Sequence, residues 1–210
     1  MLFESSFPIL FAAVIGFGHA FEADHLVAVG NIVTKRDKLR LAAKDGIYWG
    51  LGHTSTILLI GLILIVGTAT FLDGYFGYFE AVVGLMLIIL GMVRLWQVRA
   101  GRHVHEPQGL INHENNHHLA YGVGLIHGLA GSGAMILLVM TEIQGALSSI
   151  IYLLIFGLGS VVGMLVAAGI FSLPFSRRIT ESKRLQVGLT LLSALLCIGY
   201  GLYIFKENLF

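Results

Sequence analysis

Histidines and carboxylates gather in the stretch GHAFEADHLVAVGN, residues 18–31, inside a run that is otherwise apolar. The ionisable side chains are those of His19, Glu22, Asp24 and His25. Imidazole nitrogens with one or two carboxylates form a borderline ligand set. Such a set suits Ni²⁺, Co²⁺, Zn²⁺ or Cu²⁺ and is poor for Ca²⁺ or Mg²⁺, which prefer oxygen ligands. The stretch therefore predicts a site for a divalent transition metal ion.

Two further histidines, His53 and His127, lie in other apolar runs and are candidate ligands of the same ion. At about 1.5 Å per residue, both lie roughly 12 Å above the predicted cytoplasmic ends of their helices, close to the level of Asp24 and His25. Taken singly, each is explained as well by an interhelical hydrogen bond. Inserting an ionisable side chain at the bilayer centre costs roughly 2.5 to 3.5 kcal/mol, so such a side chain is normally paired and functional. For His19, Asp24 and His25 together, this cost favours the interpretation as metal ligands.

A straight helix cannot aim all the polar groups of residues 18–31 at one ion. At about 100° per residue, His19, Glu22 and His25 share one broad face and Asp24 lies well off it. His19 would also lie about 9 Å above His25 in an ideal helix. We expect either a helix distorted around Gly16–Phe21, or an Asp24 that orients a ligand from another helix.

The elements that carry these residues are predicted membrane spans. Of the 210 residues, 56% are hydrophobic and 12% are charged, which is more apolar surface than a soluble domain of this length can bury. The apolar runs reach about 20 residues or more, enough to cross roughly 30 Å of hydrocarbon. The sequence predicts an all-α polytopic membrane protein. Its six spans are at about 7–33, 46–71, 76–98, 120–141, 146–173 and 185–205.

Basic residues set the orientation of these spans. They follow the first, third and fifth spans, and the other two loops contain no Lys or Arg. By the positive-inside rule the three basic loops are cytoplasmic, which places both termini outside. No basic leader precedes the first run, so we interpret it as a retained helix and not as a signal peptide. We expect a multi-pass protein of the plasma membrane.

The chain also resembles itself, with two matches at offsets of 108 and 107 residues. The aligned stretches are 16–29 with 124–137, which pairs His19 with His127, and 49–55 with 156–162. Glycine-rich helices can look alike by chance, but the agreement of the offsets favours a repeat. Each half has three spans, so the second half enters the membrane from the opposite side, as in transporters built from inverted repeats. The predicted parts are a first repeat at 1–98, a loop at 99–119 and a second repeat at 120–210.

At these residues the chain resembles the nickel/cobalt transporter family. The signature of that family is an HX4DH pattern within a transmembrane helix, and HAFEADH, from His19 to His25, matches it. LGHTST at 51–56 resembles the family's second conserved segment, and HGLAGSGA at 127–134 is like the short urease-associated nickel permeases. The resemblance covers most of the chain.

The resemblance implies that His19, Asp24 and His25 recognise nickel or cobalt, and that His53 takes part. The longer permeases of the family have additional helices and a cytoplasmic N-terminus, and they carry HX4DH on the second helix. This chain would begin at that helix, in agreement with the outside N-terminus that its charges predict.

We expect a secondary transporter that moves Ni²⁺, or Co²⁺, into the cytoplasm for a metalloenzyme such as urease. The sequence has no P-loop or other glycine-rich phosphate motif, so an ion gradient, the membrane potential or a partner chain would supply the energy. A binding site does not encode direction, so efflux is the alternative function. Expected partners are the metal ion, the lipid bilayer and a second copy of the chain, with no nucleic acid and no resident cofactor.

A histidine-rich stretch at 102–118 lies between the third and fourth spans. Its histidines are His103, His105, His113, His117 and His118. They either bind metal transiently or belong to a solvated linker. HENNHH in this stretch matches the HxxxHH spacing of di-iron membrane enzymes, but those enzymes need several such boxes at the cytoplasmic face. An enzyme is therefore disfavoured, and the single cysteine, Cys197, excludes a disulfide within one chain.

Two glutamates, Glu80 and Glu142, lie near the predicted outer ends of their spans. They either attract cations to an outer vestibule or only mark the membrane interface.

Overall fold

The computed structural model of the chain is helical, with no strand among the residues that it describes. These residues are 2–34, 36, 38–66, 76–100, 117–130, 143, 145–175 and 182–209. The elements are α1 (Leu2–His19), α2 (Ala23–Val33), α3 (Leu39–Val66), α4 (Phe76–Arg99), α5 (His118–Ala130), α7 (Ala146–Ser172), the short 3₁₀ helix η3 (Leu173–Phe175) and α8 (Lys183–Leu209).

Several of these helices are long and apolar enough to cross a membrane. Four pass on their own, namely Leu39–Ile65, Gly77–Arg99, Ala146–Phe175 and Arg184–Leu209, and the bent pair Leu10–His19 with Ala23–Val33 is a fifth if it counts as one span. Large apolar side chains are exposed along these helices, as expected for surfaces that face lipid. The chain is thus an all-α polytopic membrane protein. The predicted span at 120–141 is described only as far as Ala130, so the count of six spans stays a prediction.

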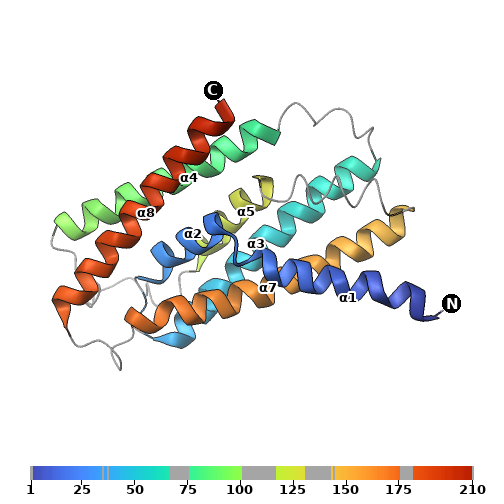
Figure 1. Cartoon of the computed structure of the whole chain (residues 1–210), viewed down its shortest axis with the longest axis horizontal. Coiled ribbons are helices and arrows are strands. Elements are labelled where there is room, and N and C mark those ends of the chain that lie inside the picture. Colours follow the sequence, from blue (N-terminus) through green and yellow to red (C-terminus); the bar gives the residue numbers. More distant parts are fainter. Residues whose placement is uncertain are drawn as a thin grey trace.

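Both chain ends lie on the same side of the molecule (Figure 1). The helix ends that flank the three basic loops gather on the opposite side, at the lower left of Figure 1. This arrangement agrees with the topology that the positive-inside rule predicts. Which of the two sides faces the cytoplasm stays a prediction.

Glycines bring the helices into backbone contact, and the contacts repeat between the two halves. A Cβ atom on Gly16 of α1 would lie 2.0 Å from the carbonyl oxygen of Phe156 in α7. One on Gly124 of α5 would lie 2.1 Å from that of Trp49 in α3. A second pair of contacts recurs at the same offsets. A Cβ atom on Gly159 would lie 2.2 Å from the carbonyl oxygen of Ala13, and one on Gly52 would lie 2.2 Å from that of Tyr121. Small residues allow such close approach without a hydrophobic driving force.

These contacts define the directions of the matched helices. α1 packs on α7 in the way that α5 packs on α3, and both pairs are parallel. α3 and α7 are antiparallel, because Gly46 contacts Met164 whereas Gly61 contacts Leu153. α1 and α5 therefore run in opposite directions, in agreement with an inverted repeat. Two hydrogen bonds, from Thr54 Oγ1 to Gly157 O (3.1 Å) and from Thr56 Oγ1 to Leu125 O (2.9 Å), tie α3 to α7 and α5.

The first span is broken between α1 and α2, which meet at an angle of 58°. α1 ends at His19 and α2 begins at Ala23. In the break, Phe21 N donates to Gly18 O (2.9 Å), and Glu22 N donates to His19 O (3.1 Å). Glu22 itself is extended, with φ −66° and ψ 156°. The predicted distortion is therefore present, and it overlaps the end of the region where the sequence predicts it.

Candidate metal centre

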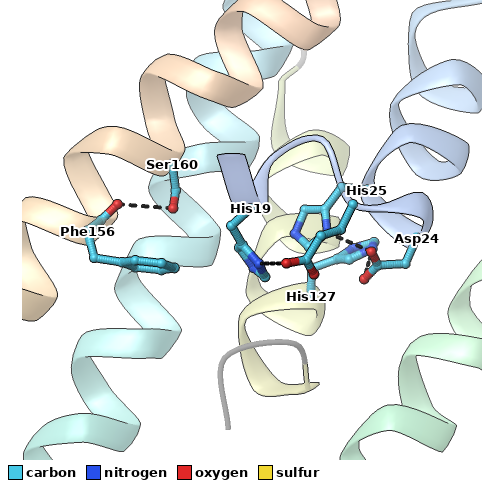
Figure 2. Close-up of polar contacts among 7 residues, drawn as sticks. His19, Asp24, His25, His127, Phe156 and Ser160 are labelled. Atoms are coloured by element: carbon cyan, nitrogen blue, oxygen red, sulfur yellow. Dashed lines mark hydrogen bonds and ion pairs between the residues drawn. The ribbon is translucent and has the colours of Figure 1, made fainter. Parts of the chain in front are cut away.

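The break between α1 and α2 points the two helix ends at one buried place (Figure 2). His19 is the last residue of α1, whereas His25 lies in the first turn of α2. Their ring centroids are 4.6 Å apart, and the two residues are 4% and 0% exposed. In an unbroken helix these residues would be separated by about 9 Å along the axis. The break thus removes the separation that a straight helix would impose.

His53 of α3 completes a group of three imidazoles. Its ring centroid lies 5.2 Å from that of His19 and 5.3 Å from that of His25. One ring nitrogen from each residue can be chosen so that all three lie within 4.8 Å of one another. Metal–nitrogen bonds of about 2.1 Å place two ligand atoms at most about 4.2 Å apart. The upper limit of 4.8 Å exceeds this by about 0.6 Å, so a small inward shift of the three rings would let one ion bridge the nitrogens.

A second group shares His25 with the first. Asp24, His25 and His127 each offer a ligand atom, again within 4.8 Å of one another. His127 lies in the last turn of α5, its ring centroid 4.8 Å from that of His25 and its Nε2 3.9 Å from Asp24 Oδ2. Four helices, α1, α2, α3 and α5, thus contribute a histidine to one cluster, and Asp24 lies at its edge.

Carboxylates orient the first two histidines. His19 Nδ1 lies 2.8 Å from Glu22 Oε1, and His25 Nδ1 lies 2.9 Å from Asp24 Oδ1 (Figure 2). Because an ionised carboxylate only accepts, each Nδ1 carries the hydrogen and donates it. The Nε2 atoms are then left with free lone pairs, and neither has a hydrogen-bond partner among the described residues. Metal-binding histidines adopt this arrangement, in which a second group holds the opposite ring nitrogen.

His53 and His127 also present unpartnered nitrogens. Both side chains are fully buried, and neither nitrogen of His53 has a partner in the described part of the chain. His127 Nδ1 donates to Val123 O of its own helix at 3.3 Å, and its Nε2 has no partner there. Within the part of the chain that the structure describes, neither residue thus makes the interhelical hydrogen bond that would explain it without a ligand. A buried polar atom left unpaired costs about 1 to 3 kcal/mol, so this cluster is costly without an ion.

Trp49 was not a candidate on sequence grounds, yet it packs against the cluster. It lies one helical turn before His53 in α3, is 1% exposed, and its ring centroids lie 5.5 to 5.7 Å from those of His25 and His127. The sequence signal for this position was its four-residue spacing from His53, which places both side chains on one helix face.

Glu22 differs from the other sequence-derived site residues. Its side chain is 56% exposed, and it meets the cluster only through its bond to His19. The five other candidates, His19, Asp24, His25, His53 and His127, lie together in the two groups described above.

His117, which the sequence places in a histidine-rich loop, is 5% exposed. Its Nδ1 lies 2.6 Å from Asp45 Oδ1, and its ring stacks on Tyr48 with centroids 5.0 Å apart. Asp45 also accepts hydrogen bonds from Nε and Nη2 of Arg36. His117 is therefore docked against the start of α3 and is not part of a solvated linker. His118 is the first residue of α5, whereas His103, His105, His113 and Glu142 lie outside the described residues.

Comparison with known proteins gives three relatives. The chain is 34% identical over 172 residues to the urease accessory protein UreH of Bacillus sp., covering 78% of this chain and 75% of the relative. It is 26% identical over 200 residues to the chloroplast protein FOR GROWTH AND FERTILITY 2 of Arabidopsis thaliana, covering 89% of this chain and 52% of the relative. It is 27% identical over 117 residues to the nickel transporter NixA of Staphylococcus aureus, covering 47% and 34% respectively. No family model and no solved structure matches.

Proposed function

We propose that this chain, which belongs to the nickel/cobalt transporter family in the group of the urease accessory protein UreH, is a secondary transporter that carries Ni²⁺ across the plasma membrane into the cytoplasm. The observation that carries this proposal is the cluster of four buried histidines in the apolar helices, each with a ring nitrogen that has no hydrogen-bond partner among the described residues. Imidazoles with one carboxylate suit Ni²⁺ and also Co²⁺, which we propose as a second substrate. The similarity to the nickel transporter NixA supports nickel as the cargo, and the similarity to the urease accessory protein UreH supports urease maturation as its use.

The residues take different roles in this proposal. One ring nitrogen each of His19, His25 and His53 holds the ion in one position. For His19 and His25 this is Nε2, because Nδ1 is bound to a carboxylate. Asp24, His25 and His127 hold it in the second, so His25 takes part in both positions. Glu22 is a positioning residue, because it holds His19 by Nδ1.

Transport also requires the site to open to each side in turn. The inverted halves meet at glycine contacts, where small residues let helices slide or rock past one another. Trp49 lies nearer than His53 to the start of α3, so opening toward that end has to move its ring. With both termini outside, that end is the cytoplasmic one. A homo-oligomer stays a prediction.

Uptake into liposomes tests this function. The purified chain alone is reconstituted, and internal Ni²⁺ is measured by mass spectrometry with and without a proton gradient. We expect uptake by the wild type, its loss in His53→Ala, and its retention in His118→Ala, which removes an exposed histidine at the start of α5. Equal uptake by His53→Ala and the wild type would refute the site.

Cellular nickel content decides between import and efflux. Expression of an importer raises the nickel content of cells in micromolar nickel medium. Nickel resistance with a lowered content would instead assign the same site to export. The di-iron enzyme is not favoured, because His117 of its HENNHH motif is bound to Asp45. Iron in the purified protein, at one equivalent or more, would revive it.

A further inference from the structure

A cavity of about 580 Å³ lies beside the histidine cluster, between α2, α4 and α8. Four of its described lining residues are acidic and none is a lysine, arginine or histidine. The acidic residues are Glu22, Asp24, Glu80 and Glu207. Two tyrosines, Tyr200 and Tyr203, and the amide of Asn208 add further polar groups. Its walls thus offer only groups that attract a cation or are neutral toward one.

The cavity extends from the end of α8 toward the centre of the molecule. Its lining residues on α8 run from Tyr200 to Asn208 on one helix face, which spans about 12 Å along the axis. Glu207 and Asn208 lie in the last turn of α8, and Glu80 lies in the second turn of α4. α4 and α8 are antiparallel, so these residues share the side of the molecule on which both chain ends lie (Figure 1).

The inner end of the cavity is also the edge of the histidine cluster. Glu22 and Asp24 line the cavity, and they hold His19 and His25 by their Nδ1 atoms. The Nε2 atom of His127, which is fully buried and has no hydrogen-bond partner among the described residues, lies 3.9 Å from Asp24 Oδ2. A gap of that length between a carboxylate oxygen and a free lone pair is one that a cation can bridge. The cavity therefore meets the histidine cluster at Glu22 and Asp24, and it is not an isolated acidic patch.

We propose that this cavity is the outer capture site for the hydrated divalent cation, with Glu80 and Glu207 at its mouth and Asp24 at its inner end. This inference rests on the proposed transport function. Carboxylates bind a hydrated ion through its water shell or replace single waters, and they suit the first contact. The imidazoles of His25 and His127, which neighbour Asp24, then bind the partly dehydrated ion. A cleft lined by one sign of charge raises the local concentration of the opposite ion and its association rate.

Association kinetics with the purified protein test the capture site directly. Ni²⁺ is mixed with detergent-solubilised protein in a stopped-flow instrument, and quenching of tryptophan fluorescence reports binding near Trp49. We expect Glu80→Gln and Glu207→Gln each to slow association about 3-fold and the double variant about 10-fold. The dissociation rate should stay unchanged, because neither residue belongs to the histidine cluster. Raising the ionic strength should slow the wild type and have little effect on the double variant.

Two matched variants separate capture from general effects. Glu114→Gln removes the same charge in the loop at 99–119, on the predicted cytoplasmic side, and should leave association unchanged. Asn208→Asp adds a carboxylate at the mouth and should speed association.

The possible outcomes distinguish the two proposals. If the wild type binds Ni²⁺ but the double variant associates at the wild-type rate, the capture site is refuted and the transport function stands. A faster dissociation rate with unchanged association would also refute it, because the glutamates would then belong to the final binding site. If the wild type binds no Ni²⁺, both proposals fall.

Discussion

Replacing His53 by leucine should stabilise the metal-free protein while abolishing its response to Ni²⁺. His53 is fully buried, and neither of its ring nitrogens has a partner among the described residues. An unpaired buried polar group costs about 1 to 3 kcal/mol, and leucine fills a similar volume without one. For a chain of this size 1 kcal/mol corresponds to about 3 °C, so we expect the melting temperature of the metal-free protein to rise by about 3 to 9 °C.

The same variant should lose stabilisation by metal. At a Ni²⁺ concentration of about 100 times the dissociation constant, binding stabilises the wild type by about 2.7 kcal/mol. His53→Leu removes one of three imidazoles from the first ligand group, so Ni²⁺ should no longer raise its melting temperature. Thermal unfolding in detergent, followed by circular dichroism with and without Ni²⁺, measures both effects.

A matched histidine-to-leucine control is His118→Leu, because His118 is exposed at the start of α5. It should leave the response to Ni²⁺ at the wild-type value. A metal-free His53→Leu protein that melts below the wild type would show that the nitrogens of His53 are satisfied in the resting protein. An undiminished rise with Ni²⁺ would show that His53 is not a ligand.

Three further predictions concern packing, the docked His117 and pH. Gly124→Ala should destabilise the protein by about 1 to 3 kcal/mol or block its accumulation in the membrane, because its Cβ would lie 2.1 Å from the carbonyl oxygen of Trp49. Gly122→Ala, which meets nothing within 4 Å, is the control and should be tolerated in the same expression assay. Asp45→Ala removes the buried carboxylate that holds His117. Breaking such a buried pair should lower the free energy of unfolding by about 3 to 5 kcal/mol, which chemical denaturation measures. An unchanged denaturation midpoint would contradict the pairing. Lowering the pH should weaken Ni²⁺ binding, because a protonated imidazole cannot ligate and protons compete with the ion; a calorimetric affinity that stays constant as the pH falls would contradict histidine ligation.

The sequence predicted the relative depths of the site residues along their helices. Counting residues from the ends of the apolar runs predicted that Asp24, His25, His53 and His127 lie at one depth, and the structure places them in one cluster. The count also showed that His19 could join them only if the first helix broke, and the break is present. Depth follows from a rise of about 1.5 Å per residue, which is a local property of a helix.

The sequence also predicts an internal repeat, and close glycine contacts recur at its offsets. An offset of 108 residues matches Gly16 to Gly124, and an offset of 107 residues matches Trp49 to Phe156. Gly16 approaches Phe156 as closely as Gly124 approaches Trp49. Glycine placement is readable from sequence because only the absence of a side chain permits such an approach.

The direction in which each side chain points depended on the packing of the helices. Glu22 and Asp24 are two residues apart in one acidic stretch, yet Glu22 is exposed and holds only His19, whereas Asp24 also faces His127. The break in the backbone rotates the start of α2, so a helical wheel drawn through residues 18–31 could not predict this difference.

What the sequence determined by itself was a membrane-spanning helical chain whose apolar runs carry imidazoles and carboxylates at a common depth, since run length, charge placement and rise per residue are properties of the chain alone. Only the tertiary structure decided which nitrogens are left without a partner, that His117 docks on Asp45, and that Glu207 shares a cavity with Glu22. Those relations join helices that are distant in sequence, and they depend on the rotation and crossing of each helix against its neighbours, which backbone contacts at glycines set.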